Sequence, residues 1–416
     1  MVLTQVSASP AATNGVANGN SKSDTNGVRL KSGENAVKVL TLQTTNPHIL
    51  GFRAMEYAAR GPVIMRAIEL EQELELAKKN GMQTKFSEII KMNLGDAHAM
   101  GQKPITFVRQ VLALISCPEL MELSGFNEDV KRKARDILSS CRGGSAGSYS
   151  DSRGMHIIRK HVAKYIEQRD GGIPSNPDDI ILSAGASEGI RACLKLLKSG
   201  EIVDEKSYTN GSIGKRSYNS KKKAGVLIPV PEYPLYSATL EEYNMKKVPY
   251  YLDEHADGWD VNVQELETIV ENVRKDGNCD PRAVVIINPG NPTGHVLSRD
   301  NIEAIIRFAY NQRLLILADE VYQDNVYGAK KFLSFKKVLS EIAAPYNSTE
   351  LISVHSCSKG FVCECGLRAG YFEVSNMDPD VKSVLTASVA ANLCPTVLGQ
   401  VSLASMLLSS CKNKHT

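Results

Sequence analysis

The stretch "LLILADEVY" runs from Leu314 to Tyr322 and decides the fold class of this chain. Its apolar residues are followed at once by a carboxylate, Asp319. Similar apolar runs alternate with segments of helical periodicity along the chain. They are "DIILSAG" (179–185), "GVLIPV" (225–230), "AVVIINP" (283–289), "ELISVHS" (350–356) and "GYFEV" (370–374). Strands rich in Val, Ile and Leu that are separated by helices predict an α/β fold, with a mostly parallel sheet covered on both faces.

The helical segments are expected near residues 61–81, 103–115, 154–171, 187–198 and 299–312, and "SEIIKMNLGDAH" (87–98) is expected to be strand-like. Residues 1–34 are rich in Ser, Asn, Ala and Gly and are predicted to be disordered. The polar, basic segment 204–225 is interpreted as a solvated loop insertion rather than as a site for an anionic partner.

Composition narrows the class of protein. The chain has 416 residues, of which 42% are hydrophobic and 23% charged, which is typical of a globular protein with a large and a smaller domain. A net charge of +3 predicts no nucleic-acid partner, and no run has the length of a membrane span. Nine scattered cysteines at no zinc-like spacing predict no disulfide framework and no metal site, so we expect a cytoplasmic protein.

Polar side chains gather at the carboxyl ends of the predicted strands, where open parallel sheets bind their ligands. They are Ala186 and Ser187 at a helix start, Asn291 in "NPGNPTG" (288–294), Asp319 and Tyr322, and Ser356, Ser358 and Lys359. Taken alone, the helix start could be a plain cap, and protein residues could pair with Asp319. Taken together, a phosphate site, a carboxylate, a phenol, an amide and a lysine suit pyridoxal 5′-phosphate (PLP), which needs an amine and a carboxylate at its pyridine nitrogen.

Several motifs carry a resemblance to a known family. They are "NLGDAHAMGQKP" (93–104), "GSYSDSRG" (147–154), "ILSAGASEGI" (181–190), "PEYPLY" (231–236), "NPGNPTG" (288–294), "LADEVYQDNVY" (317–327) and "SCSKGFVCECGLRAGY" (356–371). Over residues from about 35 to about 400, the chain resembles the alanine aminotransferases, which are PLP enzymes of fold type I. The resemblance implies a seven-stranded type of sheet.

The resemblance also implies a role for each matching residue. Lys359 would form a Schiff base with PLP and then act as general base, Asp319 would pair with the pyridine nitrogen, and Asn291 and Tyr322 would bond the phenolic oxygen. Tyr233 would stack on the ring. The residues expected to hold the phosphate are Ala186, Ser187, Ser356, Ser358 and Arg368. Tyr149 would reach the phosphate of a neighbouring subunit in a homodimer, and Gly95 would approach the substrate through its backbone.

The family's reaction moves an amino group from L-alanine to 2-oxoglutarate in two ping-pong half reactions, giving pyruvate and L-glutamate. The implied domains are an N-terminal part of a small domain (35–105), a large PLP-binding domain (106–385) and the start of a C-terminal small-domain part (386–416). Two alternatives stay open. One is a shortened isoform that binds PLP or a partner subunit without turnover, and the other is an aminotransferase of the glutamate–glyoxylate type.

The chain departs from the family in two places. Cys363 stands where relatives usually have Gly, so we expect backbone strain if that position needs a positive φ. The family continues after "ANLCPTVLGQ" (391–400) and supplies an arginine that grips the substrate carboxylate, whereas no Arg follows Arg368 here. We therefore expect a C-terminally shortened product, with apolar surface uncovered on 35–105 and 386–408, lower stability and impaired catalysis.

Overall fold

The computed structural model describes residues 61–91, 95–123, 125–198, 222–254 and 258–409. The segment 1–34 and most of the basic segment 204–225 lie outside these residues, so both interpretations stay predictions. None of the helices in the described ranges is long and apolar enough to cross a membrane.

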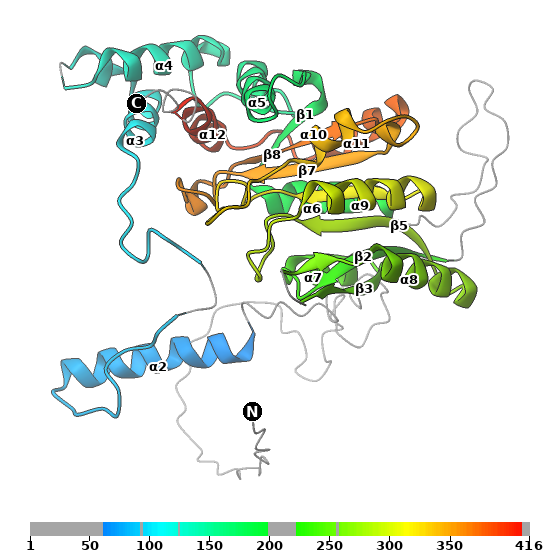
Figure 1. The fold of residues 1–416 in the computed structure, drawn as a ribbon. Coiled ribbons are helices and arrows are strands. Elements are labelled where there is room, and N and C mark those ends of the chain that lie inside the picture. The colour runs from blue at the N-terminus through cyan, green and yellow to red at the C-terminus, as the bar shows by residue number, and fades with distance from the viewer. Residues whose placement is uncertain (1–60, 92–94, 124, 199–221, 255–257, 410–416) are drawn as a thin grey trace, which may run out of the picture. The chain divides into compact units, whose positions relative to one another are not determined.

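An eight-stranded sheet forms the centre of the described part of the chain, in the order β1-β8-β7-β6-β5-β2-β3-β4 (Figure 1). Its strands are β1 (Ile180–Ser183), β2 (Lys223–Val230), β3 (Lys246–Asp253), β4 (Asp260–Val261), β5 (Cys279–Ile287), β6 (Leu315–Asp319), β7 (Leu351–Ser356) and β8 (Gly370–Ser375). The five central strands from β7 to β3 pair in parallel, while β8 is antiparallel to β7 and β1. The α/β prediction is confirmed, with one strand more than expected because the short β4 pairs with the edge of β3.

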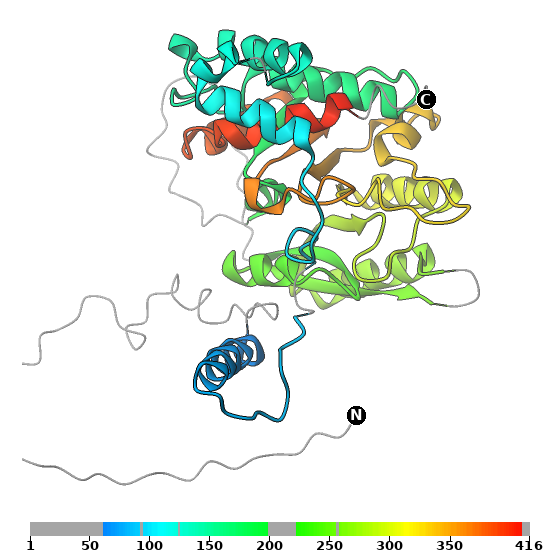
Figure 2. The same ribbon diagram turned by 90° about the vertical axis from the view of Figure 1, so that its left-hand side faces the viewer.

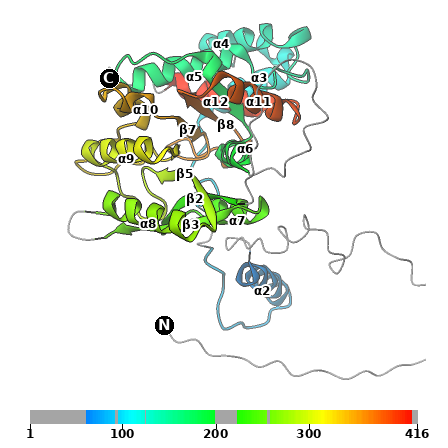
Figure 3. The ribbon, with the colours of Figure 1, turned by 90° about the vertical axis from the view of Figure 1, so that its right-hand side faces the viewer.

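Helices cover both faces of this sheet, as Figure 3 shows. Those on one face are α8 (Val263–Asp276), α9 (Arg299–Gln312) and α10 (Phe335–Glu341), and those on the other are α6 (Ala186–Leu197), α7 (Leu235–Glu242) and α11 (Pro379–Ala390). Successive side chains along a strand point to opposite faces of the sheet, which explains how each strand packs against both groups of helices. In β6, Ile316 and Ala318 join the core under the first group, and Leu317 between them joins the core under the second.

A third apolar core lies at the β1–β8 end of the sheet. Its helices are α3 (Thr106–Ser116), α4 (Glu128–Ser139), α5 (His156–Arg169) and α12 (Val397–Ser409). The expectation that residues 386–408 leave apolar surface uncovered is wrong for 399–407, because Val401 and Leu403 of α12 are buried in this core. The expectation holds for Leu393, before α12, and for Leu398 in the first turn of α12, since both are exposed. The domain division itself stays a prediction.

The N-terminal elements agree only in part with the sequence. Helix α2 (Pro62–Lys79) and helix α3 match the expected helices, and Val63 and Ile90 expose most of their surface, as anticipated for this segment. The strand-like interpretation of 87–98 is wrong for its described residues, which form coil and a turn. No described strand pairs with them, so their backbone lacks the ladder that a strand requires.

Candidate active site

Asp319 ends β6 and is buried, with 3% of the residue exposed. The hydroxyl of Tyr236 donates to its Oδ2 at 2.8 Å, and the N–H of Val321 faces its Oδ1 at 3.4 Å. Burial raises the pKa of Asp319, while the Tyr236 bond, the Val321 N–H and the charge of Lys359 oppose that rise. Since a carboxylate accepts about four hydrogen bonds, Asp319 keeps the capacity for one further donor.

Lys359 follows the end of β7, the strand that pairs with β6. Its Nζ lies 5.5 Å from the ring centroid of Tyr322, over the face of the ring. Adjacent parallel strands end at one edge of a sheet, and this explains why residues forty positions apart come together. The structure thus brings together the three predicted catalytic residues, Lys359, Asp319 and Tyr322.

The predicted phosphate residues meet at the N-terminus of α6. Ala186 begins this helix and Ser187 follows, and no side chain caps its free N–H groups. One guanidinium nitrogen of Arg368 lies 3.5 Å from Ser358 Oγ, and the other donates to the carbonyl of Ala184. Helix N-termini and guanidinium groups both attract anions.

Two glycines allow this close approach. A Cβ on Gly185 would lie 2.5 Å from Arg368 Nη2, and Gly185 has a φ of +85°. A Cβ on Gly370 would lie 2.8 Å from the backbone nitrogen of Ala186. Gly370 also pairs with Ser356 across β7 and β8, so the buried Ser356 lies beside the same helix start. The two glycines thus let the Arg368 guanidinium lie against the start of α6, and these two groups together with Ser358 form a cradle that can hold an anion.

Asn291 lies in a turn that is tied to Asp319 through its neighbour Asn288. The N–H of the fully buried Asn288 donates to the carbonyl of Asp319 at 3.0 Å, and Asn288 Oδ1 accepts from Leu297 N at 3.0 Å. The predicted sharp turn is present and fixed to the end of β6. Asn291 itself lines a small hollow with Tyr250 and His295.

Three predicted residues lie outside these direct contacts. Tyr233 packs edge-on against Tyr236 at 6.3 Å between ring centroids, which places it next to the partner of Asp319. Tyr149 is 67% exposed on a loop, beside a hollow of about 210 Å³ that it lines with Met155 and Val397. Gly95 is exposed in front of a turn. The roles of all three stay predictions.

Cys363 has a φ of +48°, so this position does adopt the left-handed conformation that favours glycine. Its thiol donates to the carbonyl of Gly360 at 2.9 Å and spans one tight turn after Lys359. Cys365 donates in the same way to the carbonyl of Ser358 at 3.0 Å. Both thiols thus bind backbone carbonyls on either side of Lys359.

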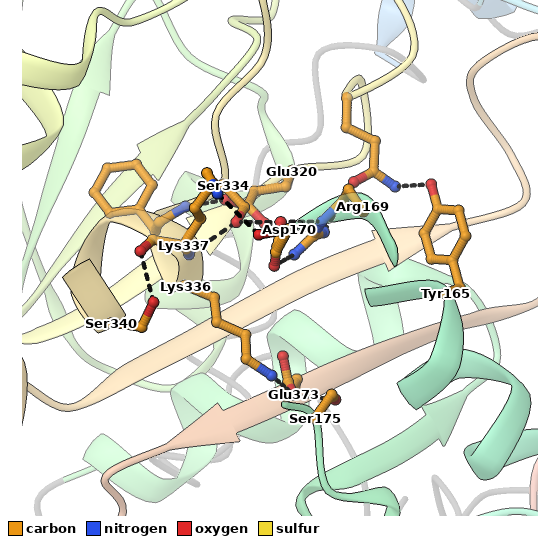
Figure 4. Close-up of polar contacts among 12 residues, drawn as sticks. Tyr165, Arg169, Asp170, Ser175, Glu320, Ser334, Lys336, Lys337, Ser340 and Glu373 are labelled. Carbon is orange, nitrogen blue, oxygen red and sulfur yellow. Dashed lines mark hydrogen bonds and ion pairs between the residues drawn. The ribbon is translucent and has the colours of Figure 1, made fainter. Parts of the chain in front are cut away.

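Sequence reasoning missed a buried polar network behind this edge of the sheet (Figure 4). Arg169 donates to both oxygens of Asp170, at 2.8 and 2.7 Å, and to Gln323 Oε1 at 2.9 Å, and lies 3.7 Å from Glu320 Oε2. Ser334 donates to Asp170 at 2.8 Å. Farther along, Lys336 and Ser175 both donate to Glu373 at 2.5 Å.

The network is connected to the site because residues of the network, or bonded to it, are adjacent in sequence to site residues. Glu320 follows Asp319, and its Oε1 accepts from Phe335 N at 2.8 Å. Gln323 Nε2 lies 2.8 Å from His355 Nε2, and His355 precedes Ser356. Burial and the Arg169 charge lower the pKa of His355 to about 3, so the ring is neutral at physiological pH. The only signal in the sequence was that these polar residues stand inside or beside apolar runs. That pattern predicts burial, but it does not indicate which residues they pair with.

Glu320 gives a stability prediction that depends on pH. Burial raises its pKa from 4.5 to about 7, against the charge of Arg169 and the N–H of Phe335. The folded state then binds more protons than the unfolded state between these values, so its stability falls as pH rises from 4.5 to 7. Glu320→Gln keeps the acceptor for Phe335 and removes this titration. Relative to the variant, the wild type should lose on the order of 3 kcal/mol of unfolding free energy across this window.

Urea unfolding of both proteins at pH 5 and pH 8 measures this difference. Glu128→Gln on α4 is the control, because the Glu128 side chain is 75% exposed. The prediction would be contradicted if the difference in unfolding free energy between wild type and Glu320→Gln were the same at both pH values.

The residues at the sheet edge fit PLP. Lys359 provides an amine, the buried Asp319 has unused acceptor capacity for a pyridinium N–H, and the uncapped start of α6 with Arg368 and Ser358 provides an anion cradle. A cationic ring beside Asp319 would stabilise its ionised form, which burial disfavours.

Comparison with known proteins decides the family. The family model "Aminotransferase class I and II" matches residues 122–414. The chain belongs to the class I and II aminotransferase family. Alanine aminotransferase 2 of Xenopus tropicalis is 52% identical over 380 residues, which are 90% of this chain and 67% of that protein. Alanine aminotransferase 1 of Homo sapiens is 50% identical over 368 residues, 88% of this chain and 68% of that protein.

The chain spans about two thirds of the length of these curated relatives. As a family member it is a transaminase, and its family implies PLP as cofactor and amino acids and oxo acids as substrates. Among solved structures, the alanine aminotransferase from Pyrococcus furiosus matches with a TM-score of 0.61 and 21% identity, over 86% of this chain and 72% of that one. An Escherichia coli aminotransferase matches with the same TM-score, 20% identity, and 86% and 70% coverage. These matches confirm the fold.

Proposed function

We propose that this transaminase uses PLP to move an amino group between L-alanine and 2-oxoglutarate, with pyruvate and L-glutamate as the products. The observation that carries the PLP chemistry is the meeting of Lys359 and Asp319 at one edge of the sheet, beside the Arg368 cradle. The substrate pair is supported by the relatives named alanine aminotransferase, which are about 50% identical over nearly nine tenths of the chain.

Each of the chain's site residues would have a separate role in the reaction. When bound, PLP supplies an aldehyde for the substrate amine and a ring that delocalises the electron pair of the substrate Cα. Asp319 would accept a hydrogen bond from the protonated ring nitrogen and stabilise its charge. Lys359 moves the proton from the substrate Cα through its Nζ, as a general base. The start of α6, with Arg368 and Ser358, would bind the phosphate and so orient the ring.

An assay that pairs two donors with three acceptors tests the proposal. Purified protein with PLP is given alanine together with 2-oxoglutarate or glyoxylate, or glutamate together with pyruvate or glyoxylate. We expect the highest kcat/KM for alanine with 2-oxoglutarate and for the reverse pair. A preference for glyoxylate would favour the glutamate–glyoxylate class. PLP binding without any amino transfer would instead favour a chain that binds the cofactor and turns over nothing.

The homodimer and the cytoplasmic location are part of the same proposal. The high exposure of Tyr149 supports a partner subunit at that loop, and sedimentation of the purified protein would test it. The cysteines in the described ranges carry free thiols, which supports a reducing compartment.

A further inference from the structure

A buried carboxylate joins the loop after Lys359 to helix α3, just after the turn at 95–102. Glu364 is 2% exposed, and Arg109 of α3 grips it with two hydrogen bonds. Arg109 Nε donates to Oε1 at 3.1 Å, and Nη2 donates to Oε2 at 2.8 Å. Such a paired geometry is stronger and more directional than a single ionic contact.

Two more contacts join the same segments. Gln102 Nε2 donates to the carbonyl of Phe361 at 2.8 Å, and His98 Nε2 lies 3.9 Å from Glu364 Oε2. In Figure 2 the coil before α3, drawn in cyan, runs past the orange loop that carries these partners. Asp96 is also close enough for its charge to act on the Cys363 thiol, whose pKa is raised chiefly by burial. The turn at 95–102 therefore lies against the loop that begins with Lys359.

Glu364 is itself held firmly on the large-sheet side. Its N–H donates to the carbonyl of Cys357 at 2.9 Å, and Val362 is buried in the same apolar core as Val111 and Leu114 of α3. The backbone of Glu364 is thus fixed, and its carboxylate extends from it to Arg109. Removal of Arg109 would leave a buried charge without its partner, which is far more costly than the loss of a surface ion pair.

We propose that Glu364 is a positioning residue, which through Arg109 fixes the start of α3 and, together with the Gln102–Phe361 bond, holds the turn 95–102 beside Lys359 as one wall of the substrate pocket. The inference rests on the proposed function, since it assigns the wall to the amino-acid substrate of that reaction. The Glu364–Arg109 pair belongs to neither the Arg368 cradle nor the Asp319 contact. Loss of the pair should loosen the turn and weaken substrate binding, whereas the bond from the Glu364 N–H to the Cys357 carbonyl would still fix the loop that carries Lys359 and Arg368 and so preserve cofactor binding.

The test compares Glu364→Gln, Arg109→Gln and the double variant in the PLP-loaded protein. We expect each single variant to raise KM for alanine by about tenfold or more, because glutamine cannot reproduce the paired charged bond. The double variant should be no worse than the singles, because the two residues act as one unit. PLP retained after gel filtration should stay within about twofold of wild type in all three. Glu128→Gln, from the exposed ion pair of Glu128 with Arg135, is the matched control.

Hydrogen exchange gives a readout that needs no activity. Backbone amides in 95–102 should exchange faster in Glu364→Gln than in wild type, while amides of β6 and β7 stay unchanged. Unchanged exchange in 95–102, or equal acceleration in the strands, would overturn the proposal, as would an unchanged KM. If the wild type transfers no amino group, the proposed function fails, and the exchange comparison still decides whether Glu364 holds this turn.

Discussion

Lys359→Ala is expected to lower kcat of the proposed transamination by at least about 10⁴-fold, the upper range for loss of a positioned acid–base group. The variant should fold as well as wild type, because Lys359 is half-buried in a loop and only its Nζ approaches the Tyr322 ring. Single-turnover mixing with alanine measures the chemical step directly, and circular dichroism checks the fold.

Two variants separate chemistry from charge. Lys359→Arg keeps a positive charge near Asp319 but cannot act as a base, since guanidinium does not lose its proton in proteins. It should be as inactive as the alanine variant. Lys160→Ala removes an exposed lysine of α5 and should leave kcat within about twofold of wild type. A Lys359→Arg variant with a tenth or more of wild-type kcat would refute the role assigned to this amine.

Asp319→Asn is the second large effect, with an expected fall of about 10³-fold in kcat/KM. The amide is nearly the size of the carboxylate, so its oxygen can still accept from Tyr236 at the 2.8 Å contact. It carries no charge to stabilise a protonated ring nitrogen. Loss of the buried charge favours stability, whereas the amide NH2 would face the N–H of Val321 and lose that weak bond, so the net change in stability should be small.

Tyr236→Phe is the matched variant on the other side of that hydrogen bond. It removes the donor and leaves the carboxylate, so the pKa of Asp319 should rise further and activity should fall by a smaller factor than in Asp319→Asn. Steady-state kinetics of both variants, with thermal unfolding alongside, give the comparison. Wild-type activity in Asp319→Asn would show that this carboxylate does not serve the cofactor.

The sequence predicted the parts of the site that depend on where strands end. Asp319 and Lys359 each follow an apolar run, and parallel pairing of β6 with β7 is enough to bring them to one edge. The same logic placed Ser187 at a helix start, and the turn chemistry of "NPGNPTG" indicated a fixed loop at Asn291. These inferences use local pattern and one rule of topology.

Contacts between side chains from distant elements could not be predicted in this way. Tyr236 and Asp319 are 83 positions apart, and Glu364 and Arg109 are 255 apart, so no local period links them. Helix α12 was misjudged for the same reason, because its apolar residues lacked a visible partner until α3 and α5 were in place. Likewise, the partners of Glu320 and Arg169 are set by the packing of α5 and α10 on the sheet.

The pairing of Ser356 with Gly370 closes the chain from Lys359 to Arg368 into one hairpin loop between β7 and β8. The amine end and the anion end of the site therefore belong to a single tethered segment. A ligand that contacts both ends acts as a cross-link inside that loop and removes conformations that the empty loop could sample. Ordering the loop would then reduce the net free energy of binding. The affinity for the cofactor would therefore depend on the stiffness of one β-hairpin.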